Sequence, residues 1–103
     1  MSPSEVLRAS ATRVRKGWCR GNLFDMRGGV CAIGAICDVT GDVALVCEVQ
    51  EALRDVLEIR WADGIVNWND AADQTAENVA RTMERAADEW DAAHVAEREL
   101  VTA

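Results

Sequence analysis

The segment 30–37 carries no charge and no hydrogen-bonding side chain apart from two thiols. Such an apolar segment has to be enclosed by other protein, whether it forms a helix or a strand. Its small residues (Ala32, Gly34 and Ala35) would let neighbouring backbones approach closely. We interpret it as a short central helix over 30–39, preceded and followed by glycines. A fully buried strand is the alternative, because periodicity alone does not separate the two.

Three longer segments with helical periodicity would surround this centre. The first, 3–16, begins with a capping box at Ser2-Pro3-Ser4-Glu5, with proline at the first helical position. The second runs over 43–59 after Asp42, a favourable N-cap residue. The third spans 75–101, and its apolar residues recur at steps of four and three, as in a heptad seam.

The connections between these helices are short. Residues 22–29 alternate weakly and contain a turn signal, so we expect a small loop or hairpin excursion there. Residues 65–70 read as a short apolar turn that closes on polar side chains. The sequence therefore predicts an all-α fold: a compact four-helix single domain over residues 1–103.

Charge and composition narrow the classes of protein further. The net charge is −7, with +4 in residues 1–30 and −11 in residues 31–103. An acidic majority repels phosphate, so we expect no nucleic-acid binding. No apolar run approaches the length of a membrane span and no signal peptide is evident, so we expect a cytoplasmic protein without a membrane partner.

The four cysteines, Cys19, Cys31, Cys37 and Cys47, do not form a recognisable site. Their gaps are wider than the close pairs that zinc sites use. Three of them lie within apolar runs, where a free thiol behaves as a small core residue. We therefore predict reduced structural thiols, no metal and no cofactor; a metal site and a redox role are the alternatives.

Three short motifs are spread along the chain. They are Trp18-Cys19-x-Gly21, Cys31-Ala32-x-Gly34-Ala35-Ile36 and Ile65-x-x-Trp68-Asn69-Asp70, followed by Thr75 at the start of a last helix. In their order and spacing they resemble a family of small proteins from actinobacteria and their phages, and the resemblance covers about residues 5–90. The family has no known function, so it implies no catalytic residue. It does imply a setting, namely a phage gene expressed in the host cytoplasm.

The polar residues of these motifs have structural and chemical interpretations. Asn69 and Asp70 can satisfy the free backbone groups of neighbouring helix ends, while Trp68 would fill space against Gly34. A thiol hydrolase would bring Cys19 and His94 together with Asn69 or Asp70, but no local signature surrounds the histidine. We therefore predict a structural role and no catalytic residue. The alternative is a ligand-binding or enzymatic domain with a pocket between Trp18, Trp61 and Trp68.

The C-terminal helix is the predicted interaction surface. Its outer half carries an aromatic residue among many carboxylates, a composition typical of an interface anchor with a charged rim. We expect a partner with a basic, partly apolar surface, either a host protein that this chain modulates or a second copy forming a homodimer. The predicted contact residues are Met83, Trp90, Asp91, His94 and Leu100. The alternative is that Trp90 packs back on the helical bundle.

Overall fold

The computed structural model describes residues 1–61 and 63–95, and within these residues it contains helices and no strand. The predicted all-α class is confirmed, but the described part of the chain contains five helices instead of four. In chain order they are α1 (Pro3–Lys16), α2 (Ala32–Val39), α3 (Val43–Leu57), α4 (Gly64–Asp70) and α5 (Ala76–Ala93).

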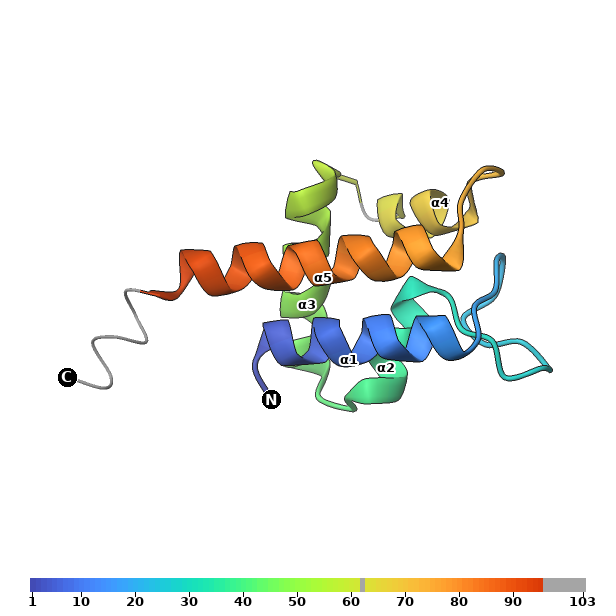
Figure 1. Cartoon of the computed structure of the whole chain (residues 1–103), viewed down its shortest axis with the longest axis horizontal. Helices are drawn as coiled ribbons and strands as arrows, with labels where there is room; N and C mark the ends of the chain where they lie inside the picture. Colours follow the sequence, from blue (N-terminus) through green and yellow to red (C-terminus); the bar gives the residue numbers. More distant parts are fainter. Residues whose placement is uncertain (62, 96–103) are drawn as a thin grey trace.

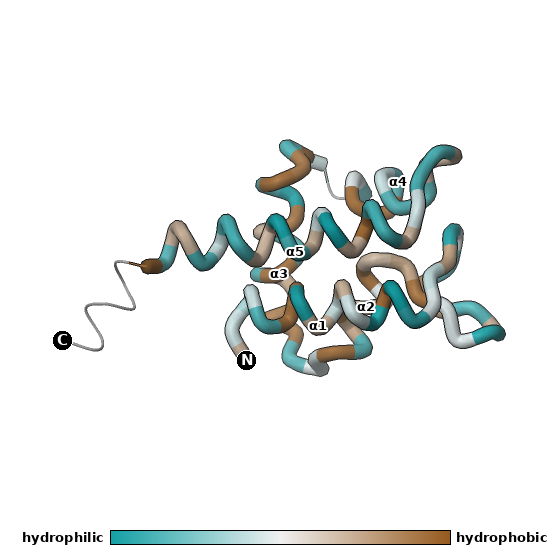
Figure 2. Tube along the Cα trace, in the orientation of Figure 1, coloured by the Kyte–Doolittle hydropathy of each residue, from teal (hydrophilic) through white to brown (hydrophobic). Residues whose placement is uncertain are grey.

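The first and last helices form the long axis of the fold. Figure 1 shows α1 and α5 lying side by side and antiparallel, with α3 crossing behind them and with α2 and α4 at the end where α1 finishes and α5 begins. Figure 2 shows that α1 and α5 alternate between polar and apolar residues, whereas α2 is mostly apolar. The core contains the fully buried side chains of all five helices, among them Leu7, Val14, Ile36, Leu53, Ile65 and Met83.

Helix α1 begins as the sequence predicts. The Ser2 hydroxyl accepts the backbone N–H of Glu5 at 3.3 Å, and the Glu5 carboxylate accepts the backbone N–H of Ser2 at 3.2 Å. Both free amides at the helix start are therefore satisfied. Apart from Leu7, the face of α1 that packs into the core consists of small and β-branched residues, including Val6, Ala11 and Val14, which allows α5 to approach closely.

Most of the apolar segment 30–37 lies in helix α2, but this helix is not enclosed on every side. α2 begins at Ala32 because Cys31 caps it, its thiol accepting the backbone N–H of Gly34 at 3.4 Å. Ala35 and Ile36 are fully buried, whereas Cys37 and Asp38 are exposed. The central position that we expected for this helix is occupied by the α1–α5 pair, since α1 contacts α2, α3 and α5.

Two boundaries differ from the sequence prediction. Helix α3 is capped by Asp42 as expected but ends at Leu57, where Glu58 adopts a left-handed conformation with φ of 57°. Residues 64–70, expected as a turn, form α4. Gly64 begins this helix at a close contact, because a Cβ at that position would meet the Ile59 side chain. A two-turn helix without a side-chain cap leaves little periodicity to detect.

Helix α5 is capped by Thr75, whose hydroxyl accepts the backbone N–H of Asn78 at 3.1 Å. Its last described turn ends at Ala93, and the predicted continuation over 96–101 lies outside the described residues. The core-facing stripe is wider than a heptad seam, because Ala80 and Ala87 are buried beside Val79, Met83 and Ala86.

The excursion after α1 is a structured loop. The backbone of Val30 pairs with Gly17 and with Cys19, each bond being 3.0 Å, and the Cys31 N–H donates to the carbonyl of Leu23 at 3.1 Å. These bonds fold residues 18–30 back on themselves and place the loop against the start of α2. In Figure 1 the loop forms the end of the molecule opposite the C-terminal end of α5.

Candidate functional site

The three sequence motifs meet at one buried side chain, Asn69. Its carbonyl oxygen accepts the indole N–H of Trp18 at 2.8 Å and the backbone N–H of Ala32 at 3.0 Å. Its amide nitrogen donates to the backbone carbonyl of Cys19 at 3.1 Å and to the Asp70 carboxylate at 3.0 Å. Asn69 is only 1% exposed, so it is almost completely removed from water while every polar group of its side chain is bonded.

Each bond of Asn69 has a distinct structural effect. The Ala32 N–H is the first amide of α2 and has no partner inside that helix, so Asn69 satisfies it from α4. The bonds to Trp18 and Cys19 fix the segment that leaves α1. We call Asn69 and its four partners, Trp18, Cys19, Ala32 and Asp70, the motif hub. The motif hub ties together three segments that are far apart in the sequence.

Neighbouring polar residues extend the motif hub. The Asp70 carboxylate also accepts the backbone N–H of Gly21 at 3.0 Å, and the pKa of Asp70 is lowered, first by the Asn69 bond and then by the Gly21 bond. Arg20 donates to the backbone carbonyls of 71, 72 and 74, and its guanidinium lies 4.8 Å from the centre of the Trp18 ring. Gln74 donates to the Trp68 carbonyl at 3.0 Å.

The packing around Gly34 and the tryptophans differs from our expectation. A Cβ on Gly34 would collide with the backbone carbonyl of Leu23, so the close neighbour of this glycine is the loop and not Trp68. The indole N–H bonded inside the motif hub belongs to Trp18. Trp68 is half-buried against the core, and Trp61 is 58% exposed.

The geometry does not assemble a thiol hydrolase. Cys19 is buried and donates to the carbonyl of Asn22 at 3.2 Å, and burial raises the pKa of its thiol, which disfavours a reactive thiolate. Cys19 follows α1 at one end of the molecule, whereas His94 follows α5 at the other (Figure 1). Among residues 1–61 and 63–95 the four cysteines are free, and no three His, Cys, Asp or Glu side chains are grouped to hold a metal ion.

A groove of about 250 Å³ lies between α3 and the C-terminal half of α5. Trp90 and His94 form part of its wall, with their rings stacked 3.8 Å apart between centroids and 13° from parallel. The His94 Nδ1 lies 2.7 Å from the Trp90 carbonyl, so the ring is fixed against the last turn of the helix. The remaining lining residues are Ala52, Asp55, Val56, Ala86, Glu89 and Ala93. We call this surface the α3–α5 groove.

Two of the predicted contact residues lie in the α3–α5 groove, and two others lie elsewhere in the described part of the chain. Trp90 and His94 line it. Met83 has no exposed surface and packs in the core. Asp91 bonds to Arg8 at 2.7 Å, and Leu100 lies outside the described residues. No residue of α3 was predicted to line this surface, although Ala52 and Val56 share one face of a helix at a spacing of four.

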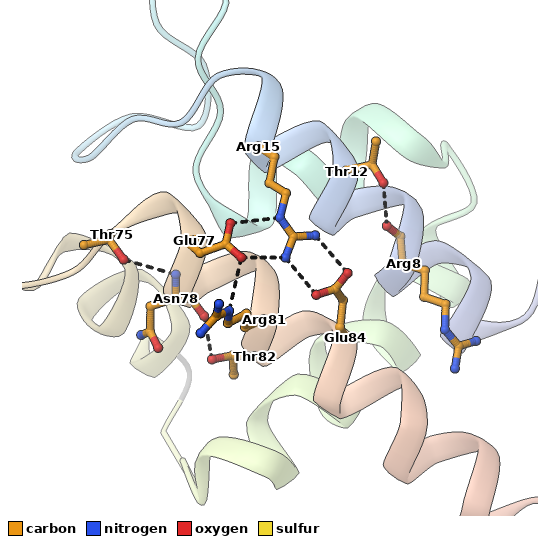
Figure 3. Close-up of polar contacts among 9 residues, drawn as sticks. All are labelled: Arg8, Thr12, Arg15, Thr75, Glu77, Asn78, Arg81, Thr82 and Glu84. Carbon is orange, nitrogen blue, oxygen red and sulfur yellow. Dashed lines mark hydrogen bonds and ion pairs between the residues drawn. The ribbon is translucent and has the colours of Figure 1, made fainter.

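Most carboxylates of α5 are occupied by arginines of α1. Arg15 binds Glu77 and Glu84 with both arms of its guanidinium, at 2.8–3.0 Å, and Arg81 reaches Glu77 at 3.1 Å (Figure 3). Arg8 similarly binds Asp88 at 3.0 Å. These bonds lower the pKa values of Glu77 and Glu84. For each carboxyl group, the largest cause of the lowered pKa is the hydrogen bond from Arg15. The basic N-terminal segment and the acidic C-terminal helix therefore neutralise each other.

Fold and motif hub together define a small all-α domain in which short motifs from three segments share one buried asparagine. The comparison with protein families agrees with this description. The chain belongs to a family of unknown function (DUF6197), whose model matches residues 1–89. No curated protein and no solved structure matches it. In the part of the chain that the structure describes, none of the helices has the length and apolar character needed to cross a bilayer.

Proposed function

We propose that this protein is a small interaction module that binds a segment of another protein in the α3–α5 groove. The observation that carries the proposal is the Trp90–His94 stack, a half-buried aromatic pair forming the wall of an open hollow. Tryptophan is the residue most enriched at binding hot spots, and stacked rings offer a large rigid surface at small entropic cost.

The size of the groove favours a side chain over a small-molecule ligand. Its volume of about 250 Å³ is below the roughly 300–1,000 Å³ of typical ligand pockets. The small side chains of Ala52, Ala86 and Ala93 leave the space of this groove open. One apolar anchor residue from a partner would fill it and cover the exposed side of Trp90.

The charges at the groove indicate which kind of partner residue should lie next to that anchor residue. Asp55 and Glu89 line the groove, and neither forms an ion pair with a described residue. The other acids of α5 are largely neutralised by Arg8 and Arg15, so a broadly basic partner surface is not required. The partner needs an apolar residue with a basic residue next to it, and a host-cell protein is our proposal for its source, which rests on the resemblance to phage proteins alone.

The tryptophan-lined pocket is the less favoured alternative. The indole N–H of Trp18 is already bonded to Asn69, and Arg20 covers its ring. A ligand entering there would have to break the bonds that hold the start of α2.

Selection of peptides from a random displayed library would test the proposal. Enriched sequences should combine an aromatic residue or methionine with a neighbouring Arg or Lys. They should lose binding to the variant Ala93→Arg, which places a cation in the groove at the end of a helix that tolerates one. Ala92→Arg changes an exposed neighbour that does not line the groove and is the matched control. Peptides that bind both variants equally would contradict the proposal.

A further inference from the structure

The loop between α1 and α2 displays three exposed apolar side chains. Met26 is fully exposed, and Leu23 and Phe24 are each about half exposed, at 49% and 51%. Single exposed apolar residues are ordinary on protein surfaces. Three within four consecutive residues, at the tip of one loop, are a candidate contact surface.

The loop is held in shape by its own hydrogen bonds. The Asp25 carboxylate accepts the backbone N–H of Arg27 at 2.9 Å and that of Gly29 at 2.6 Å. The Asp25 N–H in turn donates to the Gly29 carbonyl at 2.9 Å, and Gly28 has the positive φ of 84° that closes the turn. Arg13 anchors the Gly28 carbonyl from α1 at 2.6 Å. A loop already ordered in this way loses little conformational entropy when it binds.

The free charge at the loop tip is positive. The Asp25 carboxylate is engaged by backbone amides, whereas the Arg27 guanidinium forms no ion pair with a described residue. The tip therefore presents Phe24 and Met26 with a neighbouring arginine. This is the combination that the α3–α5 groove, with its aromatic wall and the carboxylates of Asp55 and Glu89, is proposed to accept.

We infer that the α3–α5 groove binds the loop 23–27 of a second copy of this chain; the inference rests on the proposed function of the groove. The loop and the C-terminal end of α5, which carries the groove residues Trp90 and His94, lie toward opposite ends of the long axis in Figure 1, so one molecule does not satisfy its own groove. Phe24 or Met26 of one copy packs against Trp90 of the other, and Arg27 faces Glu89 and Asp55. One loop in one groove buries little area, so the association is weak and reversible.

Sedimentation equilibrium of the full chain, at concentrations rising to several hundred micromolar, tests the inference. The average mass should rise with concentration for the wild type and fall back as salt is added, because the contact includes an ion pair. The loop variant Phe24→Ser/Met26→Ser and the groove variant Ala93→Arg should each stay monomeric. Both change partly or fully exposed side chains, and circular dichroism checks that each variant is folded.

Mixing the two variants gives the sharpest outcome. The loop variant retains an intact groove and the groove variant retains an intact loop, so the mixture should regain a one-to-one complex. A wild type that stays monomeric at all concentrations, or a loop variant that associates as well as the wild type, would overturn the inference. If association is lost in Ala93→Arg but kept in the loop variant and in Ala92→Arg, the groove binds something other than this loop, and the proposed function survives without the inference.

Discussion

Replacing Asn69 with alanine should remove more stability than any other single polar substitution in the described fold. The change deletes both the acceptor and the donor of a side chain that is 1% exposed. Three polar groups on other residues lose their hydrogen bond to Asn69 at once. They are the Trp18 indole N–H, the Ala32 N–H and the Cys19 carbonyl. The alanine methyl cannot replace any of these bonds.

The expected loss follows from the cost of buried unpaired polar groups. Each costs about 1–3 kcal/mol when its partner is removed. Trp18 is half-buried and can recover part of its bond from water, and losses within one network are not additive. We therefore expect Asn69→Ala to lower the free energy of unfolding by roughly 3–5 kcal/mol. That is a large share of the about 5–15 kcal/mol of a typical domain.

Urea denaturation followed by circular dichroism measures this loss. Asn67→Ala on the same helix is the matched control, because Asn67 is exposed, and it should stay within about 0.5 kcal/mol of the wild type. Asn69→Asp preserves the shape and the acceptor but loses the donor to Cys19 and places a second carboxylate beside Asp70. It should also be destabilising. An Asn69→Ala variant within about 1 kcal/mol of the wild type would refute the role assigned to the motif hub.

Three further predictions follow from other contacts. Gly34→Ala should cost about 1–3 kcal/mol or more, because the added methyl meets the Leu23 carbonyl, whereas Gly41→Ala, with open space around it, should cost nothing measurable in the same urea experiment. Glu77 and Glu84 have lowered pKa values, so the stability they contribute is complete above the usual carboxyl range and is lost as the pH falls through their folded values. Glu84→Gln should therefore flatten the dependence of the urea midpoint on pH below the ordinary glutamate pKa of about 4.5, and an unchanged slope would count against the Arg15 ion pairs. Trp90→Ala should cost about 1–2 kcal/mol, below the roughly 3–5 kcal/mol of a core tryptophan, because Trp90 is only half-buried, and it should abolish peptide binding to the α3–α5 groove; a core-sized loss would mean that the residue is mainly structural.

Local signals in the sequence were sufficient for the helices with strong caps. The Ser2 capping box, Asp42 and Thr75 each mark a helix start that the structure contains. Helix α4 was not predicted because it has two turns and no side-chain cap. Its stability comes from tertiary contacts, which the local sequence does not show. Its burial of Ile65 and Asn69 in the core is a tertiary effect.

The candidate site, like the helices, could be predicted only where local sequence signals determine it. The residue type of Asn69 was enough to predict that it satisfies a helix end, and its oxygen accepts the first amide of α2. Its partner Trp18 lies 51 residues earlier in the sequence, and no periodicity indicates which of four tryptophans would donate to it. Likewise, the apolar stripe that contains Trp90 could be predicted on one helix, but the groove exists only where α3 crosses α5.

Hydrogen exchange at the tryptophan indoles tests the motif hub most directly. In a 15N-labelled sample, we predict that the Trp18 indole N–H and the Ala32 amide exchange slowly, because both donate to the buried Asn69 oxygen and are released together when the motif hub opens. The Trp61 indole, on a side chain that is 58% exposed, is the internal reference for fast exchange. A Trp18 indole that exchanges as fast as that of Trp61 would contradict the account.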